Sequence, residues 1–109
     1  MFAYTVRCEF DDPAVAQRWL RWLEREHLAD VCAAGALRAE VVRFDGTPPC
    51  CEARYLFASR EAFSAYERDH APRLRAEGLK RFPPELGLRY SRTTGEVVAA
   101  APGGGRRIA

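Results

Sequence analysis

Three observations predict a single α+β domain with the element order β-α-β-β-α-β. Apolar and polar residues alternate in the segments expected to be strands, and apolar residues recur every three or four positions in the two segments between them. The end of the first helical segment has a sequence echo in the second. The chain has 109 residues, the size of one domain. We therefore expect a four-stranded antiparallel sheet with two helices on one face, the split βαβ arrangement.

The first strand and the first helix have the clearest patterns. Apolar side chains occupy every second position of residues 2–10, which predicts a strand with one apolar face. Asp12 can cap a helix that starts with Pro13. On this helix His27 projects near the middle of the apolar side, and Gly35 can end the short turn that follows. The apolar stripe consists of Val15, Ala16, Trp19, Leu20, Trp22 and Leu23.

The remaining strands are expected later in the chain. A strand at about 37–44 precedes a loop at 45–49, and a third strand follows at 51–57. The last strand is indicated by Leu86, Leu88 and Tyr90. The domain is expected to span residues 1–92, because residues 93–109 form an Ala/Gly/Pro-rich tail that we expect to be flexible.

The second helical segment repeats features of the first. Ser59 can cap it, Pro72 should break it, and its second piece should stop near Gly78. The acidic–basic–acidic–histidine sequence of residues 24–27 recurs at residues 67–70, which suggests that each half is one βαβ unit of a ferredoxin-like fold.

The polar face of the sheet leaves two interpretations open. Opposite charges could pair across neighbouring strands and keep this face in water, or two sheets could meet and form a barrel between subunits. The residues expected there include Thr5, Arg7, Glu9, Glu52 and Arg54. Ion pairs of Arg7 and Arg54 with these glutamates are favoured over binding of an anion.

Composition excludes several classes of function. The net charge of +2, from 17 basic and 15 acidic residues, does not indicate nucleic-acid binding. No apolar segment is long enough to cross a membrane and no export signal is seen, so we expect a cytoplasmic protein with reduced thiols. No phosphate-binding loop or metal-ligand spacing indicates a cofactor or a metal. The adjacent Cys50 and Cys51 should point to opposite faces of a strand and be bystanders.

Several segments resemble a family of short bacterial proteins of unknown function in the dimeric α+β-barrel superfamily. The resemblance covers roughly residues 2–98 and is carried by the runs 19–23, 26–31, 70–75 and 81–82, together with Tyr66. It implies a homodimer whose two sheets close a barrel, with the helices outside. Other members of the superfamily are cofactor-independent monooxygenases, haem-degrading enzymes, isomerases of small aromatics and ligand-sensing domains. No catalytic motif of these branches can be carried over to this chain.

His27 and His70 are the candidate catalytic residues. Each projects inward near a helix end, where a neutral imidazole at the rim of an apolar pocket could remove a proton from a phenol or an enol. Alternatively, each ring satisfies backbone groups left without partners where its helix breaks.

The candidate ligand-binding residues are aromatic. They could line a pocket between sheet and helices for a small hydrophobic or aromatic ligand, or they could simply form the core. They are Trp19, Trp22, Tyr55, Tyr66 and Tyr90. The sequence thus favours a homodimer that binds a small molecule. A further hypothesis is that it also catalyses a cofactor-independent monooxygenase-like or isomerase-like reaction on a phenolic or enolic metabolite. The alternative is a non-catalytic ligand-sensing or assembly module with structural histidines.

Overall fold

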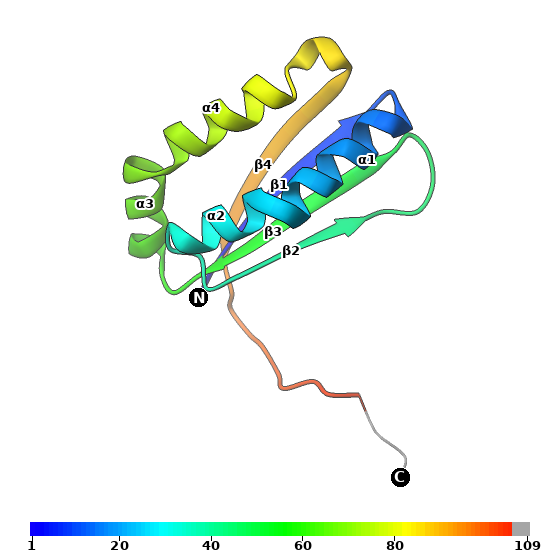
Figure 1. The fold of residues 1–109 in the computed structure, drawn as a ribbon. Coiled ribbons are helices and arrows are strands. Elements are labelled where there is room, and N and C mark those ends of the chain that lie inside the picture. The colour runs from blue at the N-terminus through cyan, green and yellow to red at the C-terminus, as the bar shows by residue number, and fades with distance from the viewer. Residues whose placement is uncertain (106–109) are drawn as a thin grey trace.

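A computed structural model describes residues 1–105 of the chain (Figure 1). The strands and helices follow the expected order, with a π-helical turn η1 and a 3-10 turn η2 as additions. The elements are β1 (Phe2–Phe10), α1 (Pro13–Trp22), η1 (Leu23–His27), α2 (Leu28–Ala33), β2 (Arg38–Arg43), β3 (Cys50–Phe57), α3 (Arg60–Asp69), α4 (Ala71–Arg81), η2 (Pro84–Leu86) and β4 (Leu88–Glu96).

The four strands form one antiparallel sheet in the order β2-β3-β1-β4. This order confirms the ferredoxin-like α+β fold, because each βαβ unit places the strand of the other unit between its own two. The helices all lie on one face of the sheet, with α1 and α2 along one side and α4 along β4 (Figure 1). Within residues 1–105, no helix covers the other face.

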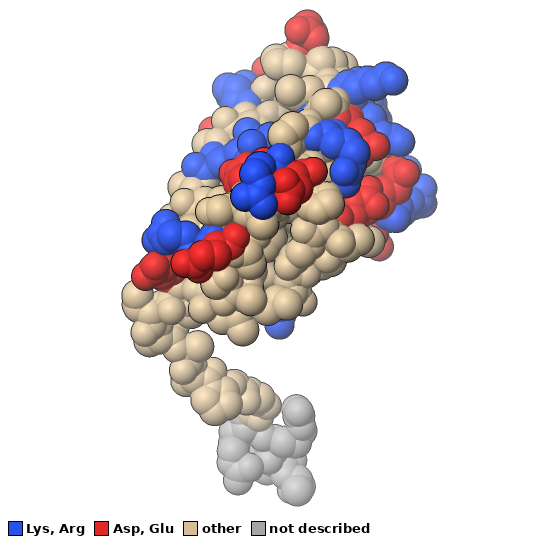
Figure 2. Space-filling model, turned by 90° about the vertical axis from the view of Figure 1, so that its left-hand side faces the viewer, with Lys and Arg blue, Asp and Glu red and all other residues tan. Residues whose placement is uncertain are grey.

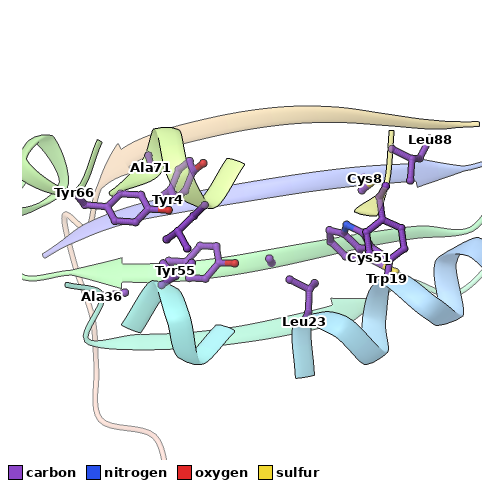
Figure 3. Close-up of a cluster of buried hydrophobic side chains, with 14 of the residues drawn as sticks. Tyr4, Cys8, Trp19, Leu23, Ala36, Cys51, Tyr55, Tyr66, Ala71 and Leu88 are labelled. Atoms are coloured by element: carbon purple, nitrogen blue, oxygen red, sulfur yellow. The ribbon is translucent and has the colours of Figure 1, made fainter. Parts of the chain in front are cut away.

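The core lies between the sheet and the helices (Figure 3). The apolar positions of β1 and β3 point into it as their alternation predicts, and Phe10, Trp19, Leu23 and Phe57 are almost completely buried. Both expected caps are present, because the Asp12 carboxylate accepts from the Ala14 amide at 2.9 Å and the Ser59 hydroxyl accepts from the Ala62 amide at 3.0 Å. The first turn of each helical segment is thus fixed by a local hydrogen bond.

Two expectations about the second half are wrong. The helix does not stop at Gly78, because α4 continues to Arg81 and Gly78 lies inside it. A Cβ atom at this position would lie 3.3 Å from Cη2 of Trp22, so the glycine leaves room for the indole. The last strand starts at Leu88 rather than Leu86, because Pro84 and Leu86 belong to η2, which Gly87 ends at a φ of 81°.

Strand β4 is longer than the sequence indicated. It pairs with the whole of β1, up to the partners Phe2 and Glu96, and therefore includes residues 93–96 that the sequence assigned to the tail. These residues show no apolar alternation because they lie on an exposed edge strand. Residues 97–105 have no regular secondary structure, and the last four residues of the expected tail lie outside the described part.

The surface carries charges of both signs. In Figure 2 acidic and basic side chains lie next to each other, and pairs such as Arg60–Glu96 and Arg75–Glu67 join different elements. Within residues 1–105, no helix has the length and apolar character that crossing a membrane requires.

Candidate functional site

A small cavity lies between the two helical arms and the sheet. Its volume is about 40 Å³. The floor is formed by β1, β3 and β4, one wall by α1 and η1, and the other by α4, with Tyr66 of α3 at one end. The side chains and glycine that line it are Tyr4, Val6, Trp19, Trp22, Leu23, His27, Ala53, Tyr55, Tyr66, Leu74, Arg75, Gly78, Leu79, Tyr90 and Arg92. A cavity of roughly 150 Å³ holds a benzene ring, so an aromatic ligand requires side chains at the mouth to move outward.

The π-helical turn positions His27. The amide of Leu28 donates to the carbonyl of Leu23, five residues earlier, which widens the helix by one residue. In an α-helix the side chains that meet are three or four positions apart. Here the wider turn brings His27 against Trp22, five positions earlier, with the ring centroids 4.3 Å apart and the planes at 20°. The π-helical turn therefore stacks the imidazole on the indole beside the cavity.

Trp22 is itself held by α4. Its indole packs over Gly78 and lies 5.6 Å from the ring of Phe82, centroid to centroid. The side chain is half-buried. The stack of His27, Trp22 and Phe82 thus joins the two helical walls of the cavity.

The imidazole of His27 is neutral at physiological pH. Burial lowers its pKa to about 4, although the carboxylate of Asp30 acts in the opposite direction. Its Nδ1 atom is buried and has no hydrogen-bond partner among the described residues. A neutral imidazole carries one acceptor nitrogen, so this ring can accept a proton or a hydrogen bond from a group in the cavity.

The lining of the cavity is rich in tyrosine. Burial raises the pKa of Tyr66 and Tyr90 to about 12 and raises that of Tyr55 as well, so all three are neutral phenols. The hydroxyl of Tyr90 accepts a hydrogen bond from Nε1 of Trp19 at 3.3 Å. Tyr4, Tyr55 and Tyr66 lie together at one end of the core, and the Tyr55 hydroxyl points towards Leu23 and Trp19 (Figure 3).

The structure separates His70 from the other candidate residues. Six of the seven line the cavity, whereas His70 lies at the junction of α3 and α4 in a surface depression with Asp30, Arg73 and Glu77. Its Nδ1 is 3.4 Å from Nη2 of Arg73. The expectation that each imidazole projects inward at the rim of an apolar pocket is therefore wrong for His70. The chain breaks at His70 ahead of Pro72, whereas at His27 the helix continues through the π-helical turn.

Three lining residues that share hydrogen bonds, Tyr4, Arg75 and Arg92, were not among the predicted site residues. Tyr4 is buried, and its hydroxyl accepts hydrogen bonds from Nη2 of Arg75 and from Nε of Arg92, each at 3.2 Å. Arg92 lies two residues after Tyr90 and four after Leu88, so the alternation of the strand places all three on the same face, and Arg92 could have been predicted from this. Arg75 could not, because its place depends on how α4 packs over β1.

The uncovered face of the sheet is held by ion pairs. Glu52 bridges Arg7 at 3.0 Å and Arg54 at 3.1 Å, which confirms the favoured interpretation of these arginines. Both guanidinium groups also lie over the ring of Phe44. Cys50 is on this face whereas Cys51 is in the core beside Cys8, so the adjacent thiols point apart as expected. Within residues 1–105, no three His, Cys, Asp or Glu residues cluster closely enough to hold a metal ion.

A family model described as a domain of unknown function, DUF4286, matches residues 1–89. The chain belongs to this family. Among curated proteins no match is found. The family assignment covers every element from β1 to η2 and the first residues of β4, and it therefore includes both walls of the cavity.

Solved structures with the same fold are described as dimeric proteins and as oxygenases. A dimeric ferredoxin-like protein from an uncultured marine organism is 14% identical, with a TM-score of 0.72 over 94% of this chain and 99% of the other. HapK from Hahella chejuensis is 16% identical, with a TM-score of 0.71 over 96% and 100%. A variant of SnoaB, a cofactor-independent oxygenase from Streptomyces nogalater, is 12% identical, with a TM-score of 0.66 over 94% and 97%. These likenesses establish the fold.

The burial of His27 predicts a specific loss of stability in acid. The imidazole gains a proton below about pH 6.5 in the unfolded chain, whereas in the folded protein it stays neutral until about pH 4. Protonation therefore favours the unfolded chain between these values, and the free energy of unfolding, unaffected by this ring above about pH 6.5, falls as the pH decreases towards 4. The free energy of unfolding should fall by up to about 3 kcal/mol more in the wild type than in His27→Phe over this range. Urea unfolding at about pH 7 and about pH 4.5 measures the difference. Equal losses in the two proteins would contradict the burial of this ring.

Proposed function

We propose that this protein binds a small phenolic or enolic metabolite in the cavity between sheet and helices, and that His27 accepts the proton of its hydroxyl group. The single observation that carries the proposal is the buried Nδ1 of His27, which has no partner among residues 1–105 and belongs to a ring that lines the cavity. A buried ring nitrogen without a partner is costly, and with Nδ1 as the unprotonated nitrogen a ligand hydroxyl would supply the missing hydrogen bond.

The low pKa of His27 limits the chemistry that it can perform. A base with a pKa of about 4 is fully neutral at pH 7, but it removes a proton efficiently only from an acidic O–H group. In an isomerase-like reaction the proton passes from the enol oxygen to His27 and is then delivered to a carbon atom. In an oxygenase-like reaction dioxygen would oxidise the anion that remains. The description of SnoaB as a cofactor-independent oxygenase supports the second possibility.

Ligand entry requires a change at the mouth of the cavity. The volume of about 40 Å³ is too small for an aromatic ring. Leu79 is about half exposed at the mouth, and the half-buried Trp22 lies beside it on the facing wall. Leu79 can turn outward without breaking a hydrogen bond, whereas Trp22 is held by its contacts with His27, Gly78 and Phe82, so Leu79 is the residue that admits the ligand in this proposal.

The acceptor role of His27 predicts a selective effect on binding. Wild type should bind 1-naphthol about five- to tenfold more tightly than 1-methoxynaphthalene, which lacks the hydroxyl proton, because one hydrogen bond contributes about 1 kcal/mol. His27→Phe keeps the stacking on Trp22 and removes the acceptor, so it should abolish the preference. His70→Phe is the matched control and should retain it. Isothermal titration calorimetry measures the affinities of all three proteins for both compounds.

The outcomes separate the two functions left open by the sequence. A preference for 1-naphthol that survives in His27→Phe would contradict the proposed proton acceptor. If His27→Phe also lowered the melting temperature strongly while both ligands bound as in wild type, His27 would be structural. The non-catalytic sensing or assembly module would then be the function supported.

We also propose that two copies associate through the face of the sheet that carries no helix. Four apolar side chains on this face are half-buried in one copy, namely Ala3, Val42, Phe44 and Leu56. The ion pairs around Glu52 are self-complementary, so a twofold contact can match each charge with its opposite. The marine ferredoxin-like protein, which is described as dimeric, supports this arrangement.

A charge on this face should separate the subunits. Leu56→Glu places a carboxylate at the proposed interface and should convert a wild-type dimer to a monomer with a similar helix content. Leu79→Glu adds the same charge on α4, on the other side of the sheet, and should remain dimeric. Sedimentation velocity at micromolar concentration distinguishes the states. A monomeric wild type would rule out the dimer.

A further inference from the structure

Two arginines converge on one hydroxyl at the edge of the cavity. Arg75 reaches it from α4 and Arg92 from β4, and each donates a hydrogen bond of 3.2 Å to the hydroxyl of Tyr4. Among the described residues that line the cavity, these two are the cationic side chains, and no carboxylate lines it. The apolar cavity thus has one end with strong hydrogen-bond donors.

The charge at this end is not balanced. Arg75 is paired with Glu67 at 2.7 Å, whereas no carboxylate among residues 1–105 lies within ion-pair distance of Arg92. Two guanidinium groups and one carboxylate leave one excess positive charge. In addition, Nε of Arg75 is buried and has no hydrogen-bond partner among these residues. The buried free donor of Arg75 favours a hydrogen-bond acceptor as ligand, and the excess positive charge favours an anionic one.

We propose that Arg75, Arg92 and Tyr4 bind the carboxylate of an aromatic or unsaturated monocarboxylic acid, whose apolar part lies against Trp19 and Trp22. This inference rests on the proposed function of the cavity and specifies the class of its ligand. The excess of one positive charge matches a monoanion. The planar guanidinium groups match the planar carboxylate, with which they form two parallel hydrogen bonds.

The positions of the two arginines and of His27 would orient such a ligand in the cavity. His27 belongs to the wall made by α1 and η1, whereas Arg75 belongs to α4 in the facing wall and Arg92 to β4 in the floor. A carboxylate at the arginines therefore directs the opposite end of the molecule towards His27. Arg92 is exposed, so its guanidinium group can move to meet the ligand without unfolding any element.

Matched acid and amide probes test the charge preference. Wild type should bind trans-cinnamate about tenfold more tightly than trans-cinnamamide, because the amide has the same shape without the charge. Arg92→Gln should bind both equally, and Arg92→Lys should recover part of the preference. Arg89→Gln is the control: this arginine lies on the same strand, on the other face of the sheet, and pairs with Asp11. It should behave like wild type in isothermal titration calorimetry.

Two outcomes would overturn the carboxylate site, and a third would overturn the proposed function as well. Equal affinities for cinnamate and cinnamamide in wild type, with 1-naphthol still bound, would overturn the carboxylate site and leave the cavity as a binding site. Equal losses in Arg92→Gln and Arg89→Gln would also overturn it, because they would indicate a general effect of protein charge. If none of the three compounds bound, the proposed function would fail and this inference with it.

Discussion

The hydrogen bond from the Leu28 amide to the Leu23 carbonyl determines where the imidazole of His27 lies. With α-helical spacing, His27 would neighbour residues three or four positions earlier, and Trp22 would be out of reach. The π-helical turn instead stacks the two rings, and Gly78 and Phe82 hold the indole from the opposite helix. The one extra residue in this turn therefore places the His27 ring in the wall of the cavity, where its Nδ1 atom is buried. Such π-turns are frequent at functional sites.

Strand β1 joins the two surfaces on which the proposals rest. It lies between β3 and β4, and its side chains alternate between the core and the uncovered face. Tyr4 points into the core, and its hydroxyl accepts hydrogen bonds from Arg75 and Arg92. Arg7 points to the uncovered face, where it forms an ion pair with Glu52. A shift of the register by one residue would exchange the two sets. The pairing of β1 with both neighbours thus fixes the cavity and the proposed dimer surface together.

The sequence predicted correctly the strands and helix starts that are determined by residues close to one another in the chain. The alternation in β1 and β3 and the caps at Asp12 and Ser59 each depend on residues adjacent in sequence, and all were predicted correctly. The aromatic residues Trp19 and Tyr55 were also placed correctly between sheet and helices, because the stripe and the alternation define which face is covered. The fold and most of the cavity were therefore accessible from the sequence.

The rest depends on contacts between distant segments. The π-helical turn has no signature in the sequence, and Gly78 resembled a helix stop although its role is to make room for Trp22. The matching sequences before His27 and His70 suggested equivalent sites, but the break ahead of Pro72 gives the second histidine a different backbone. The arginine pair depends on α4 packing over the sheet, since Arg75 and Tyr4 are far apart in the chain. Such contacts are set by tertiary packing alone.

The titration of the His27 imidazole tests the central claim most directly. The chain has two histidines, so His70→Phe leaves a single imidazole whose NMR signals can be followed against pH without ambiguity. The account predicts a pKa of about 4, with Nδ1 unprotonated at pH 7, because burial beside the cavity disfavours the charged ring. A pKa near that of an exposed histidine would show that the ring is in water, and it would contradict the account of the site.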